Sequence, residues 1–90
     1  MNIIFEPLFK QQLLNILDYI AKDKKSASIK FKNELQFKIS QLKTHPNIYR
    51  KSLYFDDENI RDLIYDGYTI IYEIQINSVH ILDIFKWQYK

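Results

Sequence analysis

The 90-residue sequence predicts one two-layer α+β domain over 1–90, with two helices covering one face of an antiparallel sheet. Three observations predict it. Apolar residues recur at helical spacing in the first half of the chain, and the spacing changes to two after Pro46. The chain has one Gly and two Pro, so few breaks interrupt these patterns. A chain of this length is too short for a multi-domain enzyme with a large cofactor cleft.

A strand and a helix are expected at the beginning of the chain. Residues 2–5 form a short apolar run that predicts the strand. Pro7 favours a helix start, because proline is tolerated at the first helical position. We therefore expect a helix over about 7–22. Its apolar positions are Phe9, Leu13, Ile16, Leu17 and Ile20.

A second helix should follow after only a few residues, so the two helices form an antiparallel hairpin. Asp23 and Ser26 are both candidate N-caps for it. The helix should end at His45, because the residue before Pro46 disfavours the helical conformation. Its apolar stripe consists of Ala27, Phe31, Leu35, Ile39 and Leu42.

The second half of the chain predicts short strands joined by tight turns. Asp66-Gly67 is the strongest hairpin signal, because this dipeptide suits a two-residue turn with positive φ, and Asn77-Ser78 predicts another turn. Strands connected in this way must pair as an antiparallel meander. The expected strands cover 60–65, 68–76 and 79–85, with a short edge strand over 53–55. Two helices can cover only one side of this sheet, so we expect the other side to be open to water or to a partner.

The charge distribution is uneven. Residues 1–51 hold ten Lys+Arg and four Asp+Glu, a net charge of +6. Residues 52–90 hold three Lys+Arg and seven Asp+Glu, a net charge of −4. Two interpretations remain open, namely solvated faces with uneven residue usage and a basic half that binds an acidic partner.

Composition excludes several classes of protein. The absence of cysteine excludes a disulfide framework, a Cys-ligated zinc site and a thiol nucleophile, and it fits a reducing compartment. No apolar run approaches the ~20 residues of a membrane span, so no membrane partner is expected. The N-terminal residues lack the pattern of a signal peptide, which predicts a cytoplasmic protein.

Few side chains suggest catalysis or metal binding. Gly67 is the only glycine, so no Gly-rich phosphate loop is present. His45 and His80 lack metal-ligand spacing, and His80 is a weak candidate for a general base. The acidic run 56–58 is interpreted as a solvated turn rather than a site for a hard cation. We therefore expect neither a metal nor a cofactor.

Arg61 is the most informative polar residue, because it is the only basic residue between Ser52 and Phe85. One interpretation is a structural ion pair with a neighbouring carboxylate. The other is an anion or phosphate contact on the open sheet face. The carboxylates considered for the ion pair are Asp62, Asp66, Glu73 and Asp83.

The order of elements, together with several sequence pieces, resembles the RelE/ParE superfamily of bacterial toxins. The pieces are YIAKD and, after Pro46, YRKS, followed by NIRDLIYDGYTIIYEI and VHILDIFK. They extend from Tyr19 to Lys86, and the first strand and helix fit as well. The resemblance implies that the N-terminal strand lies beside the last strand, in a sheet of order 1-5-4-3-2.

The resemblance also implies a function. It implies the toxin of a type II toxin–antitoxin pair, a module associated with growth inhibition and plasmid stabilization. An acidic, partly disordered antitoxin would neutralise the toxin in a hetero-oligomer, and the basic half of this chain agrees with such a partner. ParE-like members of the superfamily inhibit DNA gyrase, whereas RelE-like members are endoribonucleases that cleave mRNA on the ribosome.

The residues favour the ParE-like branch. If the protein were RelE-like, the resemblance would assign catalysis to Arg61, Arg50, Lys86 and Tyr89. The sheet-forming half is net negative, however, and a surface that binds RNA phosphates should be positive. A gyrase inhibitor that is not an enzyme is therefore favoured over an mRNA endoribonuclease. An inactive member of the family, or a structural interaction module, is the third alternative.

Two apolar residues of the second helix lie off its apolar stripe. They are Ile29 and Phe37, and we expect them to be partly exposed in the free toxin and covered by the antitoxin. Lys30 and Arg61 are the expected charged contacts of the same partner. The alternative is that the helix is simply buried over a wider face.

Overall fold

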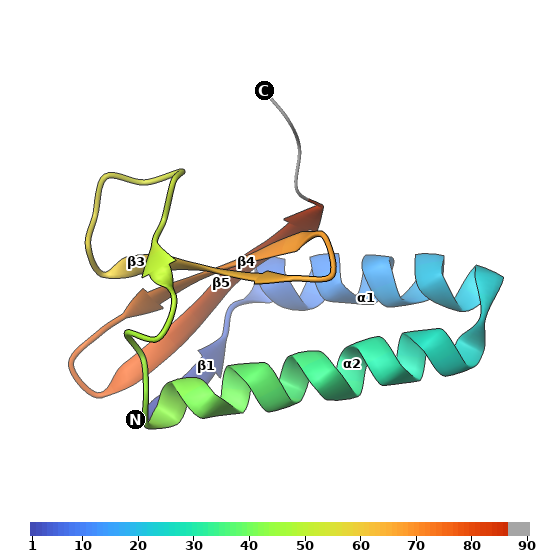
Figure 1. The fold of residues 1–90 in the computed structure, drawn as a ribbon, viewed down its shortest axis with the longest axis horizontal. Helices are drawn as coiled ribbons and strands as arrows, with labels where there is room; N and C mark the ends of the chain where they lie inside the picture. The colour runs from blue at the N-terminus through green and yellow to red at the C-terminus, as the bar shows by residue number, and fades with distance from the viewer. Residues whose placement is uncertain (87–90) are drawn as a thin grey trace.

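The computed structural model describes residues 1–86, and its two helices lie side by side against a five-stranded sheet (Figure 1). The predicted two-layer α+β arrangement is confirmed. Neither helix of the described part is long and apolar enough to cross a membrane. The elements in chain order are β1 (Asn2–Phe5), α1 (Pro7–Asp23), α2 (Lys25–Ser40), the 3₁₀ helix η1 (Gln41–Lys43), β2 (Arg50–Lys51), β3 (Ile60–Tyr65), β4 (Tyr68–Ile74) and β5 (Ser78–Lys86).

The strand order is β1-β5-β4-β3-β2, as the resemblance implied. The strands β3, β4 and β5 form the expected antiparallel meander. The prediction of a wholly antiparallel sheet was wrong, because β1 pairs with β5 in parallel and the sheet is mixed. A parallel pair needs a long connection, and the two helices together with β2, β3 and β4 supply it here.

The short edge strand lies earlier than predicted. It covers Arg50–Lys51 rather than 53–55. The chain leaves the sheet after Ser52, whose N–H still donates to the carbonyl oxygen of Ile60. The next backbone N–H, that of Leu53, donates to a side chain instead, so the strand cannot continue.

The boundaries of α2 and β4 also differ from those expected. Neither Asp23 nor Ser26 caps α2, because Lys24 occupies the cap position in an extended conformation and makes no side-chain cap bond. Its N–H instead donates to Ile20 and closes α1. The strand β4 ends at Ile74, two residues early, and Ile76 in the following turn is 93% exposed.

The hydrophobic core lies between the helical hairpin and one face of the sheet. Alternate residues of a strand point to the same face, and the helices cover the face that carries the apolar set. Burial of each such Leu, Ile or Phe side chain contributes about 1.5–3 kcal/mol. The helices contribute Phe9, Phe31, Leu35 and Ile39, η1 contributes Leu42, and the sheet contributes Leu63, Ile70, Tyr72, Val79, Ile81 and Ile84.

Tyr72 joins this core to the segment that follows η1. Its hydroxyl donates a hydrogen bond of 2.7 Å to the carbonyl oxygen of Pro46, and its ring meets that of Tyr49 edge to face. Burial raises the pKa of Tyr72 to about 12, against the opposing effect of the positive charge of Arg61. Tyr72 therefore stays a hydrogen-bond donor at neutral pH and fixes the path of the chain into β2.

The opposite face of the sheet is partly covered by the segment 52–55. The buried carboxylate of Asp62 accepts a 3.0 Å hydrogen bond from the N–H of Leu53, and its Oδ2 lies 3.6 Å from Nη2 of Arg50. The ring of Tyr54 meets that of Phe85 edge to face at 5.2 Å. This face is thus less open than the sequence suggested, because a buried carboxylate needs donors and the segment supplies one.

We predict that Tyr72→Phe destabilises the protein by about 1–3 kcal/mol at pH 7, because it leaves the half-buried carbonyl of Pro46 without its donor. Chemical denaturation measures this value. The folded state keeps the Tyr72 proton at pH values where the unfolded chain has lost it. Stability from Tyr72 is therefore complete below pH 10.0 and is lost as the pH rises toward about 12. The variant should lose less stability than the wild type over that interval, and an unchanged alkaline loss would contradict the assignment.

We also predict that Arg50→Ala destabilises the protein by about 1–3 kcal/mol, because it leaves the buried Asp62 carboxylate with less compensation. Lys51→Ala is the matched control, since Lys51 pairs with the fully exposed Asp56 and should have a smaller effect. Denaturant unfolding of both variants gives the comparison. Equal effects of the two substitutions would show that the pair with Asp62 is unimportant.

Candidate functional site

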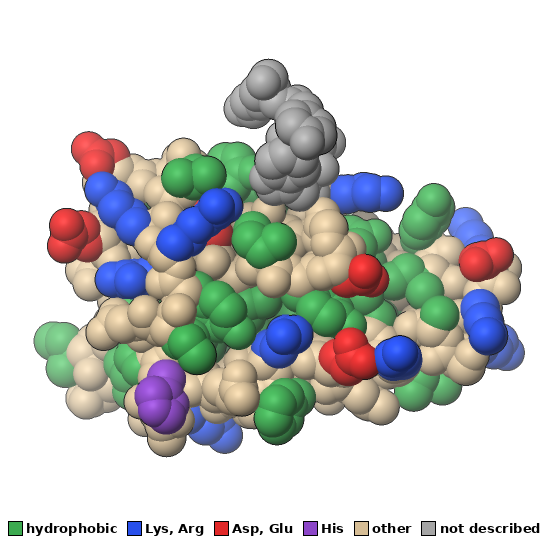
Figure 2. Space-filling view, in the orientation of Figure 1, with side chains coloured by type: hydrophobic (Ala, Val, Ile, Leu, Met, Phe, Trp, Pro, Cys, Tyr) green, Lys and Arg blue, Asp and Glu red, His purple; other side chains and the backbone are tan. Residues whose placement is uncertain are grey.

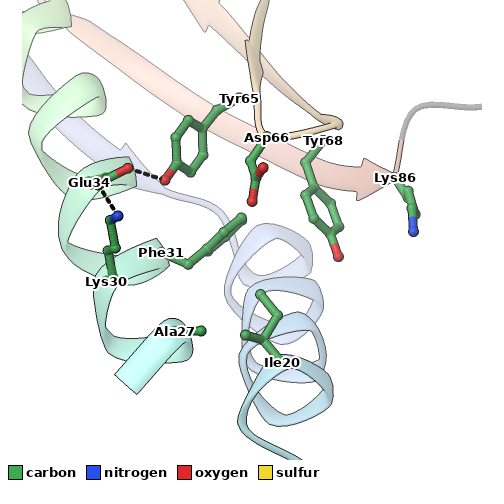
Figure 3. A pocket seen from close by; sticks show the side chains of 9 residues that line it. All are labelled: Ile20, Ala27, Lys30, Phe31, Glu34, Tyr65, Asp66, Tyr68 and Lys86. Carbon is green, nitrogen blue, oxygen red and sulfur yellow. Dashed lines mark hydrogen bonds and ion pairs between the residues drawn. The ribbon is translucent and has the colours of Figure 1, made fainter. Parts of the chain in front are cut away.

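A groove of about 570 Å³ lies where the ends of the helical hairpin meet the turn between β3 and β4 (Figure 3). Its aromatic part is Phe31, whose ring lies 5.2 Å from that of Tyr65 and 5.3 Å from that of Tyr68. Lys30 of α2 and Lys86 of β5 lie on opposite sides of it. The full lining is Ile20, Ala27, Lys30, Phe31, Glu34, Tyr65, Asp66, Tyr68 and Lys86.

Three polar side chains of this groove, those of Tyr65, Glu34 and Lys30, interact with one another. The hydroxyl of Tyr65 donates to Glu34, and Lys30 Nζ lies 3.9 Å from the other oxygen of the same carboxylate. Burial, followed by the hydrogen bond and charge of Glu34, raises the pKa of Tyr65 to about 12. Tyr65 therefore remains protonated at neutral pH, which suits it to hold the helix against the sheet rather than to accept a proton.

A second groove, of about 350 Å³, lies between the two helices and the end of β1. Phe9 and Leu35 are buried in it, whereas Leu14 is 58% exposed. Lys10 and Lys32 belong to its lining. On the face of the molecule drawn in Figure 2, apolar side chains lie at the surface among Lys and Arg side chains. An apolar groove with lysines suits an amphipathic segment that carries acidic residues.

Sequence patterns did not predict this second groove. Its lining is Phe5, Phe9, Lys10, Leu13, Leu14, Leu17, Lys32, Leu35, Gln36 and Ile39. Leu14 was the available signal, because it is an apolar residue that lies off the stripe predicted for α1. Helical spacing identifies such a residue, but it cannot show that α2 and β1 lie close enough to complete a groove.

The predicted partner-binding residues are not all in one place. Ile29 and Phe37 are 61% and 65% exposed on α2, so the expectation that they are exposed is confirmed, and the alternative of a more widely buried helix was wrong. Their contact with an antitoxin stays a prediction. Lys30 lines the first groove, and Arg61 lies in the sheet at β3.

Arg61 uses its donors within the fold. It pairs in register with Tyr72, so its side chain lies on the face that the helices cover, and not on the opposite face as the anion-binding interpretation required. Its Nη1 donates to the carbonyl oxygen of Tyr49 at 3.0 Å, and its Nε donates to that of Glu58 at 3.1 Å. The described partners are backbone carbonyls rather than the carboxylates of the ion-pair interpretation. Arg61 thus joins the two segments that flank β2.

The predicted catalytic residues do not converge in the described part of the chain. Arg50 pairs with Asp62 on the face opposite to Arg61. Lys86 lies at the end of β5 and pairs in register with Tyr68 of β4. Arg61 pairs with Tyr72, four residues further along β4. Tyr89 lies outside the described residues. A general acid and a general base must both reach the reacting group within hydrogen-bond distance, and these three cations do not share such a centre.

Metal chemistry gains no support from the described residues. Within 1–86, no group of three or more His, Cys, Asp or Glu side chains gathers to hold a metal ion. Asp56 pairs with Lys51 at 3.1 Å, and Asp57 accepts a 2.8 Å hydrogen bond from the N–H of Asn59. These contacts agree with the interpretation of residues 56–58 as a solvated turn.

Comparisons with known proteins identify the family. Residues 3–86 match the family described as "ParE toxin of type II toxin-antitoxin system, parDE". A search of curated proteins finds no match. A solved structure described as "Chromosomal ParDE TA system from P. aeruginosa" is similar, with a TM-score of 0.78 and 14% sequence identity over 98% of this chain and 97% of that one. This likeness shows the fold. Because the family match covers nearly all of the sequence, the chain belongs to the ParE toxins of type II toxin–antitoxin systems.

Proposed function

We propose that this toxin arrests bacterial growth by binding and inhibiting DNA gyrase in the cytoplasm, and that a cognate acidic antitoxin neutralises it. In this proposal the toxin acts as a binding protein and breaks no bond in its target. The observation that carries the proposal is the family match, combined with the separation of Arg61, Arg50 and Lys86 in the fold.

The engagement of the arginines argues against the RelE-like alternative. RNA binding depends on cations that neutralise phosphates, and cations already paired inside the protein contribute little to it. Arg61 donates to two backbone carbonyls, and Arg50 lies beside the buried carboxylate of Asp62. The half of the chain that forms most of the sheet carries a net charge of −4. These features favour a target that is a protein surface.

The helical hairpin is the surface that we propose for the antitoxin. The net charge of residues 1–51 is +6, which attracts an acidic partner over distances of about 10 Å at moderate salt. The groove between the helices offers buried anchor positions beside Phe9 and Leu35, with Lys10 and Lys32 in the lining for acidic side chains. Ile29, Lys30 and Phe37 are further residues of α2 that we propose the antitoxin contacts, although none of them lines this groove.

Induction of the toxin alone in a bacterial host tests the target. We expect DNA synthesis, followed by pulse-labelling over the first minutes, to fall before protein synthesis, because gyrase inhibition stalls replication. Co-expression of the antitoxin is the control and should restore growth. If protein synthesis fell first, the toxin would be acting as a ribosome-dependent endoribonuclease and the gyrase proposal would be wrong.

We predict that Leu14→Glu weakens antitoxin binding about tenfold or more, because loss of an anchor in a groove costs more than 1 kcal/mol. Ile76→Glu is the matched control, since Ile76 is 93% exposed in the turn between β4 and β5 and lies far from both helices in the sequence. Isothermal titration of each variant with the antitoxin measures the difference. Equal affinities of the two variants would remove the groove from the interface.

We predict that antitoxin binding slows amide hydrogen exchange across 27–40 of α2. The expected cause is coverage of Ile29 and Phe37, which are exposed in the free toxin. Phe37→Ser should reduce this protection and lower the affinity. Exchange rates in α2 that do not change on binding would show that the partner contacts another surface.

A further inference from the structure

Three polar side chains meet near the start of β5, which lies between β1 and β4 in the sheet, and none of them lines either groove. Ser78 and His80 lie two positions apart on β5, so they share a face of the strand. Ser78 Oγ lies 3.0 Å from His80 Nε2, and His80 Nδ1 lies 3.1 Å from Oε2 of Glu6, the residue before α1. The contacts therefore run from a hydroxyl through an imidazole to a carboxylate.

For a neutral imidazole, the atoms that meet indicate how the protons are arranged. A carboxylate can only accept, so Nδ1 carries a proton and donates it to Glu6. In a neutral imidazole the other nitrogen, Nε2, is then an acceptor, and the hydroxyl of Ser78 donates to it. This is the arrangement in which an imidazole can remove a proton from a serine hydroxyl, while a carboxylate keeps it in the required tautomer.

The serine borders a space that a small molecule can enter. An open hollow of about 650 Å³ surrounds the turn between β4 and β5, and Ser78 is part of its lining. Asn59, Gln75 and Asn77, which carry side-chain amides, line the same hollow. The amide of Gln75 donates to Glu73 at 3.2 Å, so Asn59 and Asn77 are the candidate donors for a substrate. Side-chain amides are among the donors that stabilise an oxyanion in acyl transfer.

The charges around the histidine restrict the substrate class. Glu73 lies directly across from His80 on β4, and Ile4 lies directly across from it on β1. With Glu6, two carboxylates therefore flank the imidazole, and they repel an anionic substrate. The side chains of His80 and Glu6 are 19% and 35% exposed, so water only partly screens the charge of the Glu6 carboxylate. An uncharged substrate fits these surroundings.

We propose that Ser78 is a nucleophile activated by His80, with Glu6 as positioning residue, in a site that hydrolyses small uncharged carboxylic esters. Ser78 Oγ attacks the ester carbonyl carbon and its proton passes to His80 Nε2. The bond from carbon to the alcohol oxygen breaks, and the alcohol leaves with that proton. Water then gives a proton to His80 and attacks the acyl-serine, which releases the carboxylic acid and returns the proton to Ser78. The net reaction is ester plus water to acid plus alcohol.

This inference does not depend on the toxin proposal. None of Glu6, Ser78 and His80 lines the groove between the helices or the groove at the end of the hairpin. Loss of ester hydrolysis would leave gyrase inhibition and antitoxin binding unaffected. The two proposals can therefore fail separately.

The test uses the purified full chain with a fluorophosphonate probe and with p-nitrophenyl acetate. We expect the probe to label Ser78, as located by peptide mass spectrometry, and the acetate to form an acetyl adduct at the same residue. Ser78→Ala should abolish both adducts and lower the hydrolysis rate by about 100-fold or more. Ser26→Ala removes an exposed serine of α2 and is the control that should change nothing.

Variants of the other two residues separate catalysis from a purely structural network. His80→Asn should lower the rate as far as Ser78→Ala does, while circular dichroism verifies the fold. Glu6→Gln should lower kcat and leave KM unchanged, because it disturbs the orientation of the imidazole and not the hollow. Absence of labelling at Ser78, equal labelling of Ser26, or a Ser78→Ala variant with unchanged hydrolysis would overturn the proposal.

Discussion

The structure depends on one constraint, which is that the helical hairpin covers only one face of the sheet. On the covered face, polar side chains make hydrogen bonds inside the protein, because burial removes part of their contact with water. Tyr72 therefore donates to Pro46, and Arg61 donates to the carbonyls of Tyr49 and Glu58. On the other face, Asp62 is buried only because Arg50 and the segment after β2 come to it. The loops of the second half are thus positioned by single polar side chains rather than by a second hydrophobic layer.

This constraint also decides which chemistry the fold supports. An arginine that satisfies backbone carbonyls of two segments is a structural element, and its charge is less free for a phosphate. Arg61 and Arg50 lie on opposite faces of the sheet, and Lys86 lies at the end of β5. The cations that a sheet-based nuclease needs are therefore not close together. The helical hairpin, by contrast, combines positive charge with apolar grooves, which are properties of a protein-binding surface. The proposed action of the toxin through protein partners agrees with this distribution.

The sequence predicted the elements better than it predicted the contacts. Helical spacing identified Phe31, Leu35, Ile39 and Leu42 as buried, and Asp66-Gly67 marked the turn, where both residues have positive φ. The edge strand was misplaced because its end is set by Asp62, a residue nine positions beyond Leu53. Local patterns contain no information on such a bond. The parallel partner of β1, the orientation of Arg61 and the meeting of Glu6 with His80 likewise depend on strand register across most of the chain.

In the proposed function, the toxin inhibits gyrase by binding and needs no catalytic centre of its own to do so. The most direct test is a supercoiling assay with purified DNA gyrase, relaxed plasmid and increasing amounts of the purified toxin. The account predicts that supercoiling is lost as toxin is added and is restored when the antitoxin is supplied. Full supercoiling in the presence of excess folded toxin would contradict it.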